Sequence, residues 1–488
     1  MLSLFKKSSL TLGLVGSLTI LSGCSSDKNE APEISGNLLV TVAENTTLVS
    51  QYTATDDDQG LTFSIAGTDQ QLFAIDNSGT LEFVNAPDYE NGETGPYNVT
   101  VTVTDSGDLT DSIEVTINVG DELDTPSLAL VQTLAADFSS SQVAYLDYAT
   151  QTVDDGYYPK TQSDYSINTY QNDVFHIGRF FIDTISKYSS DDANTEIWSY
   201  STQDDLDSTS RNAYTLVSLS DEKAYLIRYG SDKIWIVDPQ ATDVASFKLG
   251  ELDLSSYIPT NNSASTPSPS AAVINDGKLF VVMQRLDDAF GSSNPVYLAV
   301  FDTATDTEIE TNADATDNVM GIPLKGLNPL EHSVRAHDDN VYITTRNSYS
   351  AISVEQSMIE AVNSGDYSLT TVLSAADIID NSTQYIHSAA FVSAELGYFY
   401  ANATFFDPYR EESTLYQFNP TTGAISNETV LDTKNISFID TDAAGFLWVS
   451  VTENAAPGVE IIDTNSNMPV VSRLETQLNP NVIRFIEP

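Results

Sequence analysis

A strand-to-turn pattern that recurs along the later part of the chain restricts the fold more than any other feature. Each copy is a run of about five β-branched or aromatic residues, as expected of a half-buried strand. The run ends in Asp, Asn or Ser, whose side chain accepts hydrogen bonds from backbone N–H groups about two residues ahead and starts a tight turn. These turn-starting residues are Asp147, Ser201, Asp238, Asp302, Asn419 and Asp463.

The spacing of these turns predicts a ring of similar units. Counted from the residue numbers, the intervals are 54, 37, 64, 117 and 44, and the interval of 117 predicts one unmarked copy near residue 360. A four-stranded unit repeated every 40–60 residues or so is typical of a β-propeller blade. One such unit cannot bury both of its faces, so the copies must stack around an axis. We therefore expect seven blades over residues 127–488, although six or eight also fit the spacing.

Two segments lead to more detailed predictions. Ser127–Leu134 and Val482–Phe485 resemble strands at opposite ends of the propeller segment, and we expect them to pair in one blade and close the ring. Val354–Asn363, with the sequence VEQSMIEAVN, predicts a short helix inserted near the unmarked copy. Overall, the sequence predicts an all-β protein.

Residues 32–121 form a second all-β unit. The strand-like runs LLVTVAE, TFSI, TLEFV, YNVTVTVTD and SIEVTINV, separated by turn signals, predict a small β-sandwich. The unit resembles a cadherin-like domain over its whole length. The matching stretches are VAEN at 42–45, ATDDDQGLTFSI at 54–65, FAIDNSGTL at 73–81, Asp88-Tyr89-Glu90 and TVTDSG at 102–107.

The resemblance implies Ca²⁺ sites at the ends of this domain. Glu44, Asp88 and Glu90 match the family's ligands at the C-terminal end of a repeat, and Asp121 and Asp124 occupy the place of its acidic linker without keeping the linker's pattern. Asp56 and Asp58 match ligands that normally complete a site with a preceding repeat, which is not visible in this sequence. A hard cation with six to eight oxygen ligands relieves the repulsion between such carboxylates. Solvated acidic loops are the alternative.

Residues 1–23 predict a leader and an anchor. Lys6 and Lys7 precede an apolar run from Leu10 to Leu21, which is typical of a secretory signal. The ending LSGC resembles the lipobox of bacterial lipoproteins and implies that Cys24 is acylated, with residues 24–31 as a tether. Ser25 in the next position favours the outer membrane and leaves open whether the protein faces the periplasm or the exterior. An ordinary signal peptide with an incidental cysteine is the alternative.

The charge balance bears on partners. Lys and Arg total 20 against 70 Asp and Glu, a net charge of −50. Such a surface repels phosphate backbones, which argues against nucleic-acid binding.

Catalytic motifs are absent, but one histidine pattern stands out. Of the four histidines, His332 and His387 are each followed by a serine, Ser333 and Ser388, at what we interpret as the start of a first blade strand. First strands line the channel of a propeller, so we expect these side chains to converge. Arg179, Arg211 and Arg335 lie near first strands, and we predict a ligand site from the two His-Ser pairs with Arg211 and Arg335. A structural role, with arginines paired to local carboxylates, is the alternative.

These observations lead to a hypothesis about function. We expect a non-catalytic, cell-surface lipoprotein whose cadherin-like domain binds Ca²⁺ and whose propeller binds a protein, glycan or small ligand. Adhesion or interaction with the cell envelope is the leading role. Capture of a metal chelate or oligosaccharide for an outer-membrane transporter is the first alternative. A propeller lyase or hydrolase is the second, and a buried channel carboxylate beside an Arg or Tyr would favour it.

Overall fold

The computed structural model divides the chain into two compact units, residues 1–122 and 123–488. The residues described are 29–56, 60–87, 93–120, 128–205, 207–260, 263–287, 289–312, 319–349, 354–378, 384–406, 409–453 and 455–486. Within them, β-strands dominate, and the helical segments are single turns: η1 (Gln70–Leu72), α1 (Val244–Phe247), η2 (Ser255–Tyr257), η3 (Val354–Gln356) and η4 (Ala375–Asp377).

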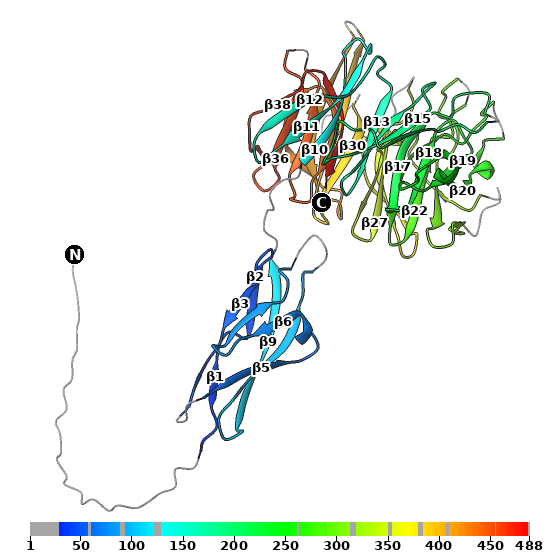
Figure 1. Ribbon diagram of the computed structural model, residues 1–488. Helices are drawn as coiled ribbons and strands as arrows, with labels where there is room; N and C mark the ends of the chain where they lie inside the picture. The colour runs from blue at the N-terminus through cyan, green and yellow to red at the C-terminus, as the bar shows by residue number, and fades with distance from the viewer. Residues whose placement is uncertain are drawn as a thin grey trace, which may run out of the picture. The chain divides into compact units, whose positions relative to one another are not determined.

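The first unit is a β-sandwich (Figure 1). One sheet has the order β2 (Leu39–Ala43), β9 (Thr110–Gly120), β8 (Tyr97–Thr104) and β5 (Thr62–Ala66). The other has the order β3 (Leu48–Gln51), β7 (Thr80–Phe83) and β6 (Phe73–Ile75), while β1 (Glu33–Ser35) pairs with β4 (Thr53–Thr55). Val99, Val101 and Val103 alternate with more exposed residues along β8 and pack with Leu81 and Phe83 of the other sheet. This alternation gives the sandwich one core.

The described residues of the second unit form seven sheets. Their strands, from the inside outward, are β39 (Asn479–Ile486), β10 (Leu128–Leu134), β11 (Ser141–Asp147) and β12 (Thr152–Lys160); β13 (Tyr165–Tyr170), β14 (Asp173–Gly178), β15 (Thr184–Ser189) and β16 (Trp198–Ser201); β17 (Ala213–Ser220), β18 (Lys223–Arg228), β19 (Lys233–Val237) and β20 (Lys248–Asp253); β21 (Pro269–Asn275), β22 (Lys278–Met283), β23 (Tyr297–Asp302) and β24 (Thr307–Glu308), with β25 (Ile322–Pro323) also on β23.

The remaining three sheets continue the same order of strands. They are β26 (Val334–His337), β27 (Asn340–Thr345), β28 (Met358–Asn363) and β29 (Leu369–Ser374); β30 (Gln384–Ser393), β31 (Leu396–Phe406), β32 (Tyr409–Phe418) and β33 (Ile425–Lys434); and β34 (Ile436–Thr441), β35 (Leu447–Val451), β36 (Gly458–Asp463) and β37 (Met468–Pro469), with β38 (Leu474–Glu475) also on β36. Contacts between innermost strands run β39, β13, β17, β21, β26, β30, β34 and back to β39. The sheets therefore form a closed ring, and the predicted propeller-type fold is confirmed.

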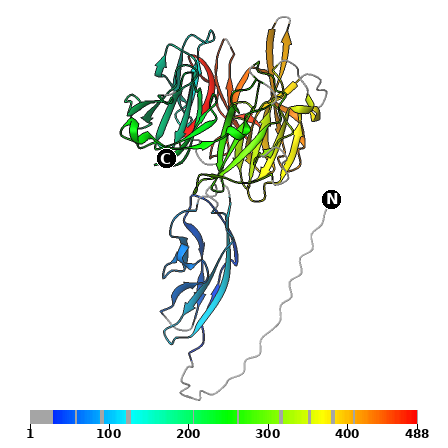
Figure 2. The ribbon, with the colours of Figure 1, turned by 90° about the vertical axis from the view of Figure 1, so that its right-hand side faces the viewer.

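The ring closes through strands from opposite ends of the unit. β39 pairs antiparallel with β10, from Leu128 opposite Ile486 to Leu134 opposite Asn479. In Figure 2 the red C-terminal strand lies beside the teal strands of this first sheet. The prediction that these two segments pair is confirmed.

The ring is held together by apolar side chains between neighbouring sheets. Tyr398 and Tyr400 of β31 pack in one cluster with Leu447 and Val449 of β35, and all four side chains are fully buried. Burying one large apolar side chain contributes roughly 1.5–3 kcal/mol, so each blade depends on both of its neighbours.

The predicted turns follow the third strand of each sheet, with two corrections. Asp238 accepts a hydrogen bond from the backbone N–H of Gln240 at 2.8 Å, and Asn419 accepts one from Thr422 at 2.8 Å. In the second sheet the equivalent residue is Ser189, at the end of β15, whereas Ser201 ends the fourth strand. In the fifth sheet it is Asn363, which accepts from Gly365 at 3.0 Å and Asp366 at 3.2 Å.

The helix predicted for Val354–Asn363 is therefore wrong. Its first three residues form the turn η3, and Met358–Asn363 is β28, the third strand of its sheet. Met358, Ile359, Glu360, Ala361 and Val362 are all buried, because this strand has neighbours on both faces. A run buried on both faces lacks the alternation that would have identified it as a strand.

Replacing Asn363 tests this correction. Asn363→Ala removes the acceptor for two backbone N–H groups, so we expect the free energy of unfolding to fall by about 0.5–1.5 kcal/mol. Alanine would instead stabilise a helix at this position. Urea denaturation of the variant measures the change, and increased stability would contradict the turn.

Candidate functional site

A cavity of about 290 Å³, here the first cavity, lies at the end of the ring where the innermost strands begin. Tyr214 comes from the start of β17 and Ser437 from the start of β34, while Gln284 and Arg346 follow the second strands β22 and β27. Loops after second strands and the beginnings of first strands meet at this end, so distant parts of the sequence contribute to one site.

The two predicted histidines both line this cavity. His332 lies two residues before β26 and His387 lies within β30, and Ser388 lines the cavity with them. Ser333 is buried and is not among the lining residues. The hydroxyl oxygen of Ser388 is also buried, and it has no hydrogen-bond partner within the described part of the chain.

His387 is held in one tautomer. Its Nδ1 lies 2.7 Å from the hydroxyl oxygen of Tyr400, and the same hydroxyl lies 2.9 Å from the carbonyl oxygen of Ser437. A carbonyl only accepts, so the single proton of Tyr400 goes to Ser437 and the hydroxyl oxygen accepts from His387 Nδ1–H. The lone pair of His387 is therefore on Nε2.

Arg346 is a cation without a carboxylate partner in the described residues. Its guanidinium lies 4.4 Å from the ring centre of Tyr385 and 5.2 Å from that of Tyr349. Its Nε is buried, and no described residue accepts a hydrogen bond from it. Burial, and secondarily the charge of Arg346, lowers the pKa of His387 from 6.5 to about 3.

A charged chain of residues forms the floor of the first cavity. Glu331 forms an ion pair with Arg179, and the Arg179 guanidinium packs 4.6 Å from the ring centre of Tyr214. Glu331 Oε1 also lies 3.2 Å from Nε2 of His332, whose Nδ1 accepts from Arg484 at 2.9 Å. Burial alone would raise the pKa of Glu331, but Arg179 and His332 hold it well below its usual range.

His332 stays neutral in this setting. Burial is the main cause that lowers its pKa from 6.5 to about 4, and the charge of Arg484 acts in the same direction. The attraction of Glu331 for a protonated ring opposes this shift without overcoming it. A neutral His332 with Nδ1 as acceptor has its proton on Nε2, toward Glu331.

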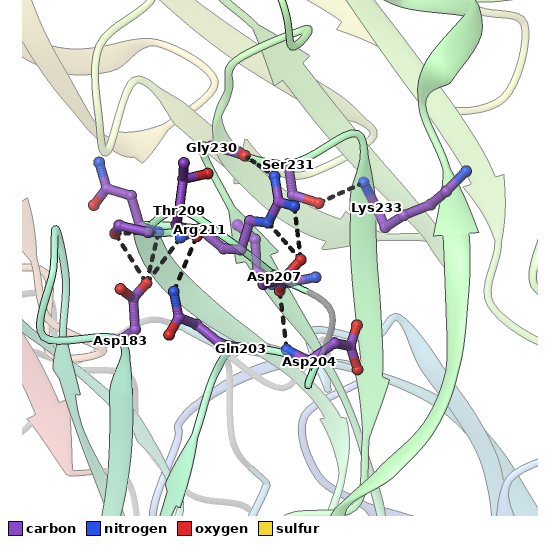
Figure 3. A network of polar contacts seen from close by, with 12 residues as sticks. Asp183, Gln203, Asp204, Asp207, Thr209, Arg211, Gly230, Ser231 and Lys233 are labelled. Atoms are coloured by element: carbon purple, nitrogen blue, oxygen red, sulfur yellow. Dashed lines mark hydrogen bonds and ion pairs between the residues drawn. The ribbon is translucent and has the colours of Figure 1, made fainter.

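The two predicted arginines lie elsewhere. Arg211 lines neither this cavity nor the one described below: its Nε donates to Asp207 at 2.7 Å and one terminal nitrogen donates to the carbonyl of Gly230 at 3.2 Å (Figure 3). Its charge therefore serves a structural network. Arg335 lines a second cavity of about 270 Å³, which shares His332 with the first.

Sequence reasoning missed the residues that give the first cavity its chemistry. Glu331 was visible beside His332 but was one acidic residue among 70. Arg346 follows a second strand, and no local pattern indicates that this loop reaches the channel. Tyr400 belongs to a strongly apolar strand and resembled a core residue, which it also is.

The predicted Ca²⁺ ligands are only partly within the described residues. Asp58, Asp88, Glu90, Asp121 and Asp124 lie outside them. The Glu44 side chain is almost fully buried, its N–H donates to Gly120, and that of Asn45 donates to Pro87. Gly120 and Pro87 directly precede Asp121 and Asp88 in the sequence. Within the described ranges, no three His, Cys, Asp or Glu side chains group to hold a metal.

The predicted leader and Cys24 also lie outside the described residues. In the part of the chain that is described, no helix is long and apolar enough to cross a membrane.

Comparison with known proteins identifies the first unit. Residues 39–120 match the cadherin domain family. This confirms the cadherin-like domain predicted from the sequence. No curated protein matches the chain.

Solved structures resemble the second unit. A putative 6-phosphogluconolactonase from Bacteroides fragilis has a TM-score of 0.49 and 11% identity, and covers 75% of this chain and 100% of its own. A periplasmic gluconolactonase from Pseudomonas aeruginosa has a TM-score of 0.48 and 12% identity over 74% and 99%. A streptogramin B lyase has a TM-score of 0.39 and 12% identity over 68% and 93%. At these values the likeness transfers no activity.

One expectation is corrected by this comparison. The sequence led us to expect a protein that is not an enzyme, whereas the similar structures include a gluconolactonase and a lyase. The absence of local motifs did not justify that expectation, because residues from different blades can form a site without any local motif and a fold does not fix function. The partly buried carboxylate of Glu331, beside Arg179 and Tyr214, is the kind of feature that we expected to favour the enzyme alternative.

The protonation states of the two histidines can be measured. We expect nitrogen-15 NMR to show neutral rings at pH 6, with the proton on Nδ1 of His387 and on Nε2 of His332. In the unfolded chain these histidines have a pKa near 6.5, so as pH falls the unfolded chain binds protons before the folded chain does. The stability that the two neutral rings contribute is therefore lost as pH falls from about 6.5 toward 4. His387→Gln should reduce that loss, and titration of either native ring near 6.5 would contradict the geometry.

Proposed function

We propose that the propeller binds a small anionic compound in the first cavity and acts on it by proton transfer, as a hydrolase or lyase. The observation that carries this proposal is the placement of Arg346, a cation with no carboxylate partner among the described residues, beside a histidine whose Nε2 carries a lone pair. A planar guanidinium with free donors matches a carboxylate or phosphate group.

The charge of the whole chain makes this cation informative. In a protein with a net charge of −50, an arginine has many carboxylates available to it. Arg346 is packed instead against Tyr385 and Tyr349, which hold the guanidinium in place without neutralising it. A ligand anion would complete its pairing, and the aromatic rings exclude water and strengthen the attraction.

Anion binding would also raise the pKa of His387, the proposed base. Burial and Arg346 hold the pKa of unliganded His387 at about 3, which is too low for an effective general base at neutral pH. An anion on Arg346 cancels the repulsion from that charge and raises the pKa of His387. Tyr400 and Ser437 keep the ring oriented, so the base gains strength when a substrate is present.

Binding can be tested before the substrate is known. We expect one or more small anions from a panel of acetate, citrate, inorganic phosphate and D-gluconate to raise the unfolding midpoint at fixed ionic strength. Arg346→Gln should weaken that binding about tenfold or more, since a hydrogen bond to a charged group contributes roughly 1.5–3 kcal/mol. Lys325→Gln removes an exposed cation at the surface and serves as the charge-matched control.

Catalysis is tested with those esters of the binding anions that keep a charged group for Arg346, such as phosphate monoesters and citrate monoesters. His387→Gln should lower turnover about 100-fold or more while leaving binding close to that of the natural protein. Product formation followed by NMR gives the rate. Equal turnover in the variant would overturn the assignment of His387, and equal binding in Arg346→Gln would overturn the assignment of the cavity.

We also propose that the cadherin-like domain binds Ca²⁺ through Glu44, Asp88, Glu90 and Asp121, with Asp124, Asp56 and Asp58 as further candidates. Support comes from the buried Glu44 and from its backbone bond to Gly120. When bound, the cation would neutralise these carboxylates and stiffen the end of the domain.

Calorimetry tests the Ca²⁺ proposal. Ca²⁺ should raise the unfolding midpoint of the first unit above its value in chelator, and Glu44→Gln should remove most of that shift. Glu33→Gln changes an exposed carboxylate in the same unit and is the control. A midpoint that does not move with Ca²⁺ would contradict the site.

Attachment to an outer membrane through acylated Cys24 likewise remains our proposal. Mass spectrometry of the protein from a two-membrane bacterium should show residues 1–23 removed and acyl chains on Cys24. Several acyl chains bind a bilayer stably, since each buried CH₂ contributes about 0.8 kcal/mol.

A further inference from the structure

The second cavity contains a cluster of cations that the proposed chemistry does not use. It is lined by residues of the innermost strands, including Asn168 of β13 and Thr215 of β17, together with Arg335, Asp440 and Arg484. His332 and its neighbours separate it from the first cavity, because His332 lines both.

The two arginines of this cavity are held by groups that leave donors available. One terminal nitrogen of Arg335 donates to the carbonyl of His332 at 2.9 Å, and those of Arg484 donate to Ile483 at 2.7 Å and to His332 at 2.9 Å. Both guanidiniums pack 5.5 Å from the ring centre of Phe438. Nε and the other terminal nitrogen of Arg335 are buried and have no hydrogen-bond partner within the described residues.

The donors of Arg335 are not fully matched by the carboxylates of the cluster. Asp440 is the one carboxylate that lines the second cavity in the described residues, and its oxygen lies 3.4 Å from Nε of Arg335, beyond good hydrogen-bond distance. Glu331, beside His332, forms an ion pair with Arg179, which also contacts Asp164 at 2.8 Å. The three arginines are therefore matched in number by three carboxylates, but two buried N–H groups of Arg335 have no hydrogen-bond partner within the described residues, and a buried donor without a partner is costly.

We propose that the second cavity binds a small oxyanion, a carboxylate or phosphate group, between Arg335 and Arg484. Two adjacent guanidiniums offer paired N–H donors in the geometry that such groups accept. The cavity of about 270 Å³ has room for several waters, each of which occupies roughly 30 Å³ in the liquid, and therefore for a small anion. Asn168 and Thr215 also line this space, and their side chains are hydrogen-bonded to each other at 3.0 Å.

The test uses the full chain, purified in detergent, with inorganic phosphate, methyl phosphate and acetate as separate probes. Isothermal titration and thermal unfolding are measured at constant ionic strength against chloride. We expect at least one probe to bind, and Arg335→Gln and Arg484→Gln each to weaken its affinity about tenfold or more. The probe that binds with the higher affinity shows whether the cavity prefers a phosphate or a carboxylate group.

Arg346→Gln is the matched control, because it removes an arginine of the first cavity. If a probe binds both cavities, titration should show two binding steps, of which Arg346→Gln weakens one and Arg335→Gln the other. Loss of binding in Arg346→Gln alone would assign the anion to the first cavity and overturn the present inference while supporting the proposed function. Arg484 contacts His332, so its variant could fail to fold. In that case Arg335→Gln and Arg335→Lys test the proposal. Unchanged affinity for the probe in both variants would overturn it, and so would the finding that no probe binds more tightly than chloride.

Discussion

The pairing of β39 with β10 is the interaction on which the rest of the propeller depends. Each sheet buries its two faces against neighbours, so an open array would leave two apolar faces in water, whereas a ring leaves none. Closure also brings three residues of β39, Asn481, Val482 and Arg484, to the axis of the ring. There they line the same cavities as residues from the middle of the sequence. The cavities exist because the ring is closed.

Several charged side chains lie around the axis of the ring. With 70 acidic and 20 basic residues, arginines on the outside would find partners readily, and Arg211 does so with Asp207. Around the channel the pattern differs, since Glu331 with Arg179, His332, Arg484 and Arg335 form a connected series through the centre of the ring. Arg346 stands apart from this series and has aromatic neighbours. This separation gives the two cavities different chemistry.

The sequence predicted those features whose cause is local. An Asp or Asn that ends a strand and starts a turn can be recognised directly, and this located the third strands that end near Asp147, Asp238, Asp302, Asn419 and Asp463. Ser189 and Asn363 were missed, because serine starts turns weakly and β28 has no alternating pattern. The convergence of His332 and His387 was predictable, because each lies a similar number of residues before the second strand of its sheet, β27 or β31. The sequence could not predict the roles of Arg346, Tyr400 and Glu331. Those roles depend on contacts between blades, and no single segment of the sequence shows such contacts.

The closure of the ring also has a consequence for the order of synthesis. β10 begins at Leu128 and β39 ends at Ile486, so the first sheet lacks its innermost member until almost the whole unit has been made. A partner so distant in sequence is slow to find, because a long loop must close before the contact is gained. During synthesis from the N-terminus, the chain would therefore pass through a stage in which the edge of β10 that faces the axis has no partner strand. Premature release or a shortened C-terminus at that stage would expose a template for mispairing with other chains.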